Sequence, residues 1–120
     1  MIEFKNVSYT YANTQTPAVS DINFTVASGE LKVVTGASGC GKTTLMRLAN
    51  GLCPQIYGGR LEGSVTVAGF NVSETPVADL SEVIGTLFQD PEEQFFALNV
   101  GDEIAFALRS RSFDPKDVRE

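Results

Sequence analysis

Apolar and polar residues alternate along the first part of the chain with the two-residue period of a β-strand. The apolar side chains occupy even positions in residues 2–5 and odd positions in residues 7–11, so we expect a bulge or turn near Asn6. Residues 22–27 alternate again, and residues 28–30 form a short Ser-Gly-Glu turn to the next apolar segment. Strands this close in sequence favour antiparallel pairing.

A glycine-rich stretch follows, with a strand pattern before it and a helix pattern after it. Residues 31–35 are few and rich in β-branched side chains, which predicts a buried strand. Four apolar residues then recur at the spacing of one helix face: Leu45, Leu48, Ala49 and Leu52. They predict a helix over residues 43–50, with Gly51 as its C-terminal cap.

The pattern is less regular beyond this helix. Residues 52–62 contain a proline and paired glycines, which predict a loop. Residues 64–68 alternate again and predict an exposed edge strand, which ends in a turn at Gly69.

Two more helices and a second buried strand are expected in the rest of the chain. Thr75 and Pro76 suit the N-cap and the first turn of a short helix. Residues 83–88 are apolar enough for a buried strand. Asn99 begins the last helix, with Asp102 as its capping partner. Four residues are expected on the buried face of that helix: Val100, Ile104, Ala107 and Leu108.

The glycine-rich stretch itself, residues 36–43, has the sequence GASGCGKT and fits the phosphate-loop pattern. Its glycines have no Cβ atom, so successive backbone N–H groups can turn inward around phosphate oxygens. The helix that follows adds the positive end of its dipole. In this pattern the Lys42 ammonium reaches the β- and γ-phosphate oxygens, and the Thr43 hydroxyl holds Mg²⁺.

Composition narrows the classes of function. A chain of 120 residues has room for one domain, and its net charge of −6 argues against an electrostatic nucleic-acid binder. It contains no histidine to serve as a base or metal ligand. We expect Cys40 and Cys53 to be free thiols in a reducing cytosol. These residues show no signal-peptide pattern and no apolar run long enough to span a bilayer, so we expect neither feature and expect any link to a membrane to go through a partner.

Other residues leave alternatives open. Tyr9 or Tyr11 can stack on a purine base or pack within the sheet. Gln89 follows residues 83–88, the second of the two predicted buried strands. At the carboxyl end of that strand its amide can orient a water or ligate Mg²⁺, but it can equally belong to a surface turn.

The segment after Gln89 combines acidic and aromatic residues. We interpret the carboxylates of residues 90–93 as a solvated turn rather than a general-base or metal site, because Pro91 interrupts any shared helical face. Phe95 and Phe96 are either core residues or an exposed docking patch. Phe106 lies off the predicted buried face of the last helix and can also contact a partner.

These residues, in this order, resemble the nucleotide-binding subunit of ABC transporters over essentially the whole chain. Tyr11 falls at the family's base-stacking aromatic residue. Gln89 matches its Q-loop glutamine, which contacts Mg²⁺ and the attacking water and couples the site to the membrane subunit. The family's Walker A loop corresponds to nine residues: Gly36, Ala37, Ser38, Gly39, Cys40, Gly41, Lys42, Thr43 and Thr44. The resemblance implies an α/β P-loop NTPase core with an N-terminal antiparallel β subdomain, and ATP and Mg²⁺ as cofactors.

A narrower resemblance is to the ATPases of energy-coupling-factor importers, which take up vitamins and metal ions such as cobalt. It is carried by residues 50–52, 56–59, 62–63 and 88–94. It implies an import ATPase on the inner face of the cell membrane, with Lys42 and Gln89 as catalytic residues. The implied partners are a second ATP-binding domain and a transmembrane subunit that docks near residues 89–96.

The family also has an LSGGQ-type signature, a Walker B strand that ends in a catalytic glutamate, and a switch histidine, none of which occurs in these 120 residues. We therefore expect residues 1–120 to be the N-terminal part of one nucleotide-binding domain, with negligible ATP hydrolysis alone. Strands are missing beside residues 31–35, so we also expect exposed sheet edges and oligomerisation or marginal stability. A non-catalytic nucleotide-binding or partner-docking module is the alternative. A small P-loop kinase is less favoured, because Arg109 and Arg111 only weakly suggest an arginine lid.

Overall fold

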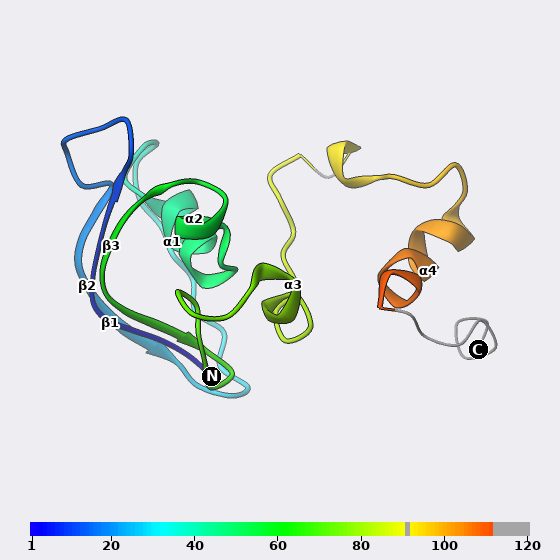
Figure 1. The fold of residues 1–120 in the computed structure, drawn as a ribbon, viewed down its shortest axis with the longest axis horizontal. Coiled ribbons are helices and arrows are strands. Elements are labelled where there is room, and N and C mark those ends of the chain that lie inside the picture. The colour runs from blue at the N-terminus through cyan, green and yellow to red at the C-terminus, as the bar shows by residue number, and fades with distance from the viewer. Residues whose placement is uncertain (91, 112–120) are drawn as a thin grey trace. The chain divides into compact units, whose positions relative to one another are not determined.

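The computed structural model of the chain describes residues 1–90 and 92–111 (Figure 1). The chain divides into two compact units, Met1–Thr86 and Leu87–Glu120. The first unit contains a sheet of four strands and three helices, and the described part of the second contains a short 3₁₀ helix and one α-helix.

The sheet of the first unit is antiparallel, with the strand order β2-β1-β3-β4. β1 (Ile2–Tyr11) pairs with β2 (Val19–Val26) on one side and with β3 (Gly59–Val67) on the other, and the two-residue β4 (Phe70–Asn71) follows β3. The long strands curve together, and two helices lie on their concave side (Figure 1). The predicted antiparallel pairing is confirmed for β1 and β2.

The change of register near Asn6 is confirmed as a bulge. The pairing of β1 with β3 shifts between Lys5 and Ser8, and Asn6 itself has a φ of +49°. Opposite it, Gly63 has a φ of +79°, and a Cβ atom there would overlap the carbonyl oxygens of Lys5 and Asn6. The bulge therefore requires glycine on the neighbouring strand.

The prediction of an exposed edge strand at residues 64–68 was wrong in position. β3 begins earlier, at Gly59, and lies inside the sheet, because Thr66 and Val67 pair with β4 on the side opposite β1. Val65 and Val67 are buried in the core. The turn at Gly69, whose φ is +90°, is confirmed and leads into β4.

Three helices complete the first unit. α1 (Lys42–Ala49) agrees with the predicted helix, and Gly51 follows its C-cap in the left-handed conformation as expected. The short α2 (Leu52–Gln55) occupies part of the predicted loop and buries Cys53. α3 (Val77–Leu80) has Pro76 rather than Thr75 at its N-cap, so the predicted cap was wrong by one residue.

The core of the first unit lies between the sheet and these helices. Its buried side chains come from all three long strands and from each helix, with Val72 following β4. They are Phe4, Val7, Tyr9, Val19, Leu48, Ala49, Cys53, Val65, Val67, Val72 and Leu80. None of these side chains comes from the two segments that the sequence predicted as buried strands, although the partly buried Ile84 of residues 83–88 packs against the core.

Those two predictions were wrong for the described residues. Residues 31–35 form no strand, and Leu31 and Val33 are 88% and 73% exposed. Residues 83–88 form no strand either, and Leu87 is 78% exposed. A strand needs a neighbour that accepts and donates its backbone hydrogen bonds. No described strand pairs with either segment.

In the second unit, η1 (Glu92–Gln94) precedes α4 (Val100–Ser110). The predicted cap is confirmed, because the Asn99 side chain accepts a hydrogen bond of 2.9 Å from the Asp102 amide and donates one to its carboxylate. Arg109 also donates to that carboxylate, which holds the pKa of Asp102 below its ordinary value.

The predicted buried face of α4 was wrong. Val100, Ile104, Ala107 and Leu108 are exposed, whereas Ala105 is buried. Phe106 instead stacks on Phe96, with 5.5 Å between the ring centroids. Phe95 and Phe96 are exposed, which excludes the core alternative for them among the described residues. Pro91, the side chain of Glu93 and residues 112–120 lie outside the described part, so part of the expected acidic turn cannot be placed.

We predict that Gly63→Ala lowers the free energy of unfolding by about 3 kcal/mol. Roughly 1 kcal/mol comes from a left-handed backbone with a Cβ atom, and the rest comes from the overlap with the opposite strand. Gly29→Ala is the matched control, because Gly29 has a φ of +76° with open space around it. Its expected loss is only about 1 kcal/mol. Urea denaturation followed by circular dichroism measures both, and equal losses would contradict the packing argument.

We also predict that the exposed apolar residues 31–35 drive self-association. Replacing both Leu31 and Val33 by lysine should shift the chain toward monomer, because apolar side chains at these positions are largely in water. Ser20→Lys with Ser73→Lys adds the same charge at two other exposed positions and serves as the control. Sedimentation velocity at several concentrations measures the effect. A similar reduction in the control would point to net charge as the cause.

Candidate phosphate-binding site

The glycine-rich loop leads directly into the first turn of α1. Gly41 is the N-cap of this helix, with a φ of +98°. A Cβ atom at Gly41 would lie 2.7 Å from both the carbonyl oxygen of Ala18 and Cγ1 of Val19. Glycine is therefore required at this position both by the backbone angle and by the close approach of the chain before β2.

The Lys42 ammonium turns back over the loop. Its Nζ donates hydrogen bonds to the carbonyl oxygens of Gly36 at 2.8 Å and Ala37 at 2.7 Å, and lies 3.7 Å from Sγ of Cys40. The loop is thereby closed into a ring around a positive charge. Such an arrangement places a cation next to exposed backbone, as phosphate binding requires.

The rest of the loop is accessible. Residues 36–40 are all exposed, and so is Thr43 at the start of α1. No side chain caps the N-terminus of α1, so its first N–H groups have no competing side-chain acceptor. Thr44, by contrast, is only 5% exposed. The loop and the helix start can thus present N–H donors and the Thr43 hydroxyl to an anion.

Tyr11, at the end of β1, extends its hydroxyl to this helix. The hydroxyl lies 3.1 Å from Oγ1 of Thr44, and Arg47 donates to it at 3.3 Å. The Tyr11 ring contacts the ring of Tyr9 edge-on, with 5.0 Å between centroids. Tyr9 is fully buried, and this burial raises the pKa of its hydroxyl. The Tyr11 hydroxyl thus contacts the first two turns of α1, the helix that follows the phosphate loop, while its role in base stacking stays a prediction.

Sequence reasoning missed Arg47 and Tyr57 at this site. The guanidinium carbon of Arg47 lies 4.1 Å from the centre of the Tyr57 ring. Arg47 follows Thr44 by one helical turn, so the i, i+3 spacing could have placed it on the same face. Tyr57 could not have been found this way, because it reaches the site through the connection between α2 and β3.

Gln89 belongs to the second unit. It lies in a bend after residues 83–88, and its side chain is exposed. Because residues 83–88 form no strand, the argument that placed Gln89 at the carboxyl end of a strand does not apply. Its roles as Mg²⁺ ligand and catalytic residue stay predictions that rest on the resemblance.

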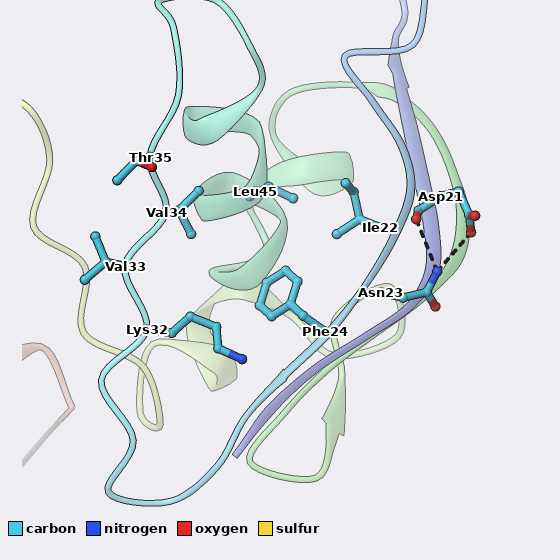
Figure 2. A pocket seen from close by; sticks show the side chains of 9 residues that line it. All are labelled: Asp21, Ile22, Asn23, Phe24, Lys32, Val33, Val34, Thr35 and Leu45. Atoms are coloured by element: carbon cyan, nitrogen blue, oxygen red, sulfur yellow. Dashed lines mark hydrogen bonds between the residues drawn. The ribbon is translucent and has the colours of Figure 1, made fainter.

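One hollow in the first unit lies beside the loop rather than at it. It measures about 560 Å³ and is lined by β2, residues 32–35 and one residue of α1. Figure 2 shows Ile22 and Phe24 of β2 facing Leu45 of α1 and Val34 across this space. Its largely apolar lining suits packing side chains better than phosphate.

Residues 1–90 and 92–111 contain neither a candidate metal cluster nor a candidate membrane-spanning helix. No group of three or more cysteine or acidic side chains is arranged to hold a metal ion. No helix there is both long and apolar enough to cross a membrane.

Comparison with known proteins identifies the family. The family model described as ABC transporter matches residues 19–117, a range that contains the glycine-rich loop, α1 and Gln89. The chain belongs to the ABC transporter family. It is accordingly a P-loop NTPase domain, in which an antiparallel sheet and α1 flank the phosphate loop. The predicted fold class is confirmed.

Three relatives illustrate the extent of the match to the ABC family. Proteins of Treponema denticola and Enterococcus faecalis are each 40% identical over 120 residues, all of this chain but 24% and 21% of their own lengths. A protein of Pyrococcus abyssi is 39% identical over 118 residues, 98% of this chain and 42% of its own length. All three are named as ABC transporter ATP-binding proteins. The chain therefore spans between about a fifth and two fifths of these relatives.

Proposed function

We propose that the chain is the ATP-binding part of an ABC import ATPase that couples ATP binding and hydrolysis to the uptake of a vitamin or metal ion. The single observation that carries the proposal is the closed loop, with the Lys42 ammonium bound to the Gly36 and Ala37 carbonyls at the start of α1. The names of the relatives support the nucleotide. The energy-coupling-factor class rests on the resemblance of residues 50–52, 56–59, 62–63 and 88–94.

In this proposal Lys42 exchanges its carbonyl partners for phosphate oxygens. Both sets of acceptors lie at the same loop, so the ammonium needs only a local side-chain movement. The loop amides and the N-terminus of α1 then supply the remaining donors. Positive charge and N–H groups fixed before the reaction stabilise the charge that develops on the transferred phosphoryl group.

The residues present also fit Mg²⁺, which prefers oxygen ligands and supplies charge neutralisation on the phosphates when it is bound. The Thr43 hydroxyl is exposed beside Lys42. The Gln89 amide oxygen is the second proposed ligand. Tyr11 is proposed to stack on the base, since its ring lies beside the same helix end through Thr44.

The proposed partners follow from the family and from exposed surface. A second ATP-binding domain would complete the site, and a transmembrane subunit would dock near residues 89–96, where Phe95 and Phe96 are 66% and 77% exposed. The protein would then work at the inner face of the cell membrane. A non-catalytic nucleotide-binding module remains the alternative. An LSGGQ motif and an apolar strand ending in Asp-Glu in the coding sequence after Glu120 would favour the ATPase.

We predict that Lys42→Ala weakens MgATP binding by a factor of about 30. Hydrogen bonds to charged groups contribute roughly 1.5–3 kcal/mol each, and 1.4 kcal/mol corresponds to a tenfold change in affinity. Isothermal titration calorimetry on the 120-residue chain measures the effect. Lys5→Ala removes the same charge from an exposed pair with Glu3 and should change the affinity less than twofold. Equal affinity of the Lys42 variant and the native chain would refute the proposed site.

We further predict that the 120-residue chain releases phosphate from MgATP no faster than its Lys42→Ala variant. The chain contains neither the signature motif nor the Walker B glutamate, so an attacking water has no general base from that motif. A coupled phosphate-release assay under saturating MgATP measures this. Steady turnover that disappears in the Lys42 variant would contradict the expectation.

A further inference from the structure

The hydroxyl of Tyr11 is surrounded by three side chains from two helices. Oγ1 of Thr44 lies 3.1 Å from it, Nη1 of Arg47 lies 3.3 Å from it, and Sγ of Cys53 lies 3.9 Å from it. Thr44 and Arg47 belong to α1, and Cys53 belongs to α2. Tyr11 itself ends β1. A single oxygen atom therefore joins the sheet to both helices behind the phosphate loop.

The chemistry of the guanidinium fixes the direction of the hydrogen bond between Arg47 and Tyr11. A guanidinium only donates, so Tyr11 must accept from Arg47. In the contact with Thr44 either hydroxyl can donate, and the Cys53 thiol adds a weak interaction with the same oxygen. The Tyr11 hydroxyl thus has three side-chain partners, which together fix its position. The Tyr11 ring is therefore held at its hydroxyl by these three side chains and along the ring by a T-shaped contact with Tyr9.

Arg47 is itself fixed from the opposite side. Its guanidinium lies over the Tyr57 ring, at 4.1 Å from the centroid, and such contacts orient the planar group. The Tyr57 carbonyl also accepts a hydrogen bond from Tyr9. Tyr9 and Tyr57 therefore brace the two partners, Tyr11 and Arg47, whose hydrogen bond sets the ring. Arg47 is half-buried and forms no ion pair in the described residues, so its observed partners are these aromatic side chains.

We propose that Arg47 is a positioning residue for the nucleotide base: it fixes the Tyr11 ring in the orientation that stacks on the base, without contacting the nucleotide. The inference rests on the proposed function, because it requires that Tyr11 stacks on a base. It assigns Arg47 no part in phosphate binding, since its guanidinium is held against Tyr11 and Tyr57 while Lys42 closes the loop.

The test compares two ligands that share phosphates but differ in the base. The probes are ATP and inorganic tripolyphosphate, each with Mg²⁺, titrated calorimetrically into the 120-residue chain. Arg47→Ala should weaken ATP binding about fivefold, the value of one net hydrogen bond, and leave tripolyphosphate binding unchanged. Arg60→Ala is the matched control, because Arg60 is an exposed arginine paired with Glu62. It should change neither affinity.

Tyr11→Phe provides the second arm, because it keeps the ring but removes the clamped hydroxyl. It should weaken ATP binding about as much as Arg47→Ala, and the double variant should be no weaker than either single variant. Additive losses, or an Arg47→Ala effect that is equal for ATP and tripolyphosphate, would overturn the positioning role. If the native chain bound ATP and tripolyphosphate with equal affinity, the base would contribute nothing to binding. That result would overturn the positioning role of Arg47 but not the phosphate site. Failure of both ligands to bind would instead overturn the proposed function and this inference with it.

Discussion

The pairing of β1 with strands on both of its sides is the constraint on which the first unit depends. The middle of β1 carries the bulge at Asn6, and its C-terminal end carries Tyr9 and Tyr11. The bulge restores the alternation so that Val7 and Tyr9 point into the core, where both are fully buried. Because β3 pairs with β1 up to Tyr11, the connection that carries Tyr57 is also brought to the end of α1. The pairing of the sheet thereby positions the aromatic residues Tyr9, Tyr11 and Tyr57 beside α1.

Features with local causes could be predicted from the sequence. The bulge near Asn6, the turn at Gly69, the helix after the phosphate loop and the cap at Asn99 each depend on a few neighbouring residues. Residues 31–35 and 83–88 could not be predicted in the same way, because apolar β-branched composition states only that a segment suits a sheet. Whether a strand forms depends on a partner elsewhere in the chain, and the described sheet offers none to either segment. The apolar stripe of α4 failed as a burial prediction for the same reason.

The residues of the candidate site also fall into those with a local sequence signal and those that depend on distant parts of the chain. The glycine spacing and Lys42 identified the loop, since its conformation is encoded within eight residues. The order of Arg47, Tyr11 and Thr44 in space could not be derived, because it depends on how α1 packs on the end of β1. Only the i, i+3 relation between Thr44 and Arg47 was visible in advance. Tertiary contacts thus add to the loop a second group of residues that no motif contains.

The phosphate loop is anchored unequally at its two ends. On one side Gly41 begins α1, which packs on the sheet through Leu48 and Ala49. On the other side residues 31–35 are exposed and form no strand within the described sheet, and Lys32 donates a hydrogen bond to the Thr25 carbonyl of β2. The hydrogen bonds from Lys42 to Gly36 and Ala37 are therefore the contacts that tie the free end of the loop to the helix. In the proposed binding mode, an anion accepts the hydrogen bonds of the Lys42 ammonium in place of the Gly36 and Ala37 carbonyls. The loop N–H groups then donate to the same anion, so the loop is held through the ligand. Ligand binding and loop order are then coupled through one side chain, and a strand paired with residues 31–35 would strengthen both.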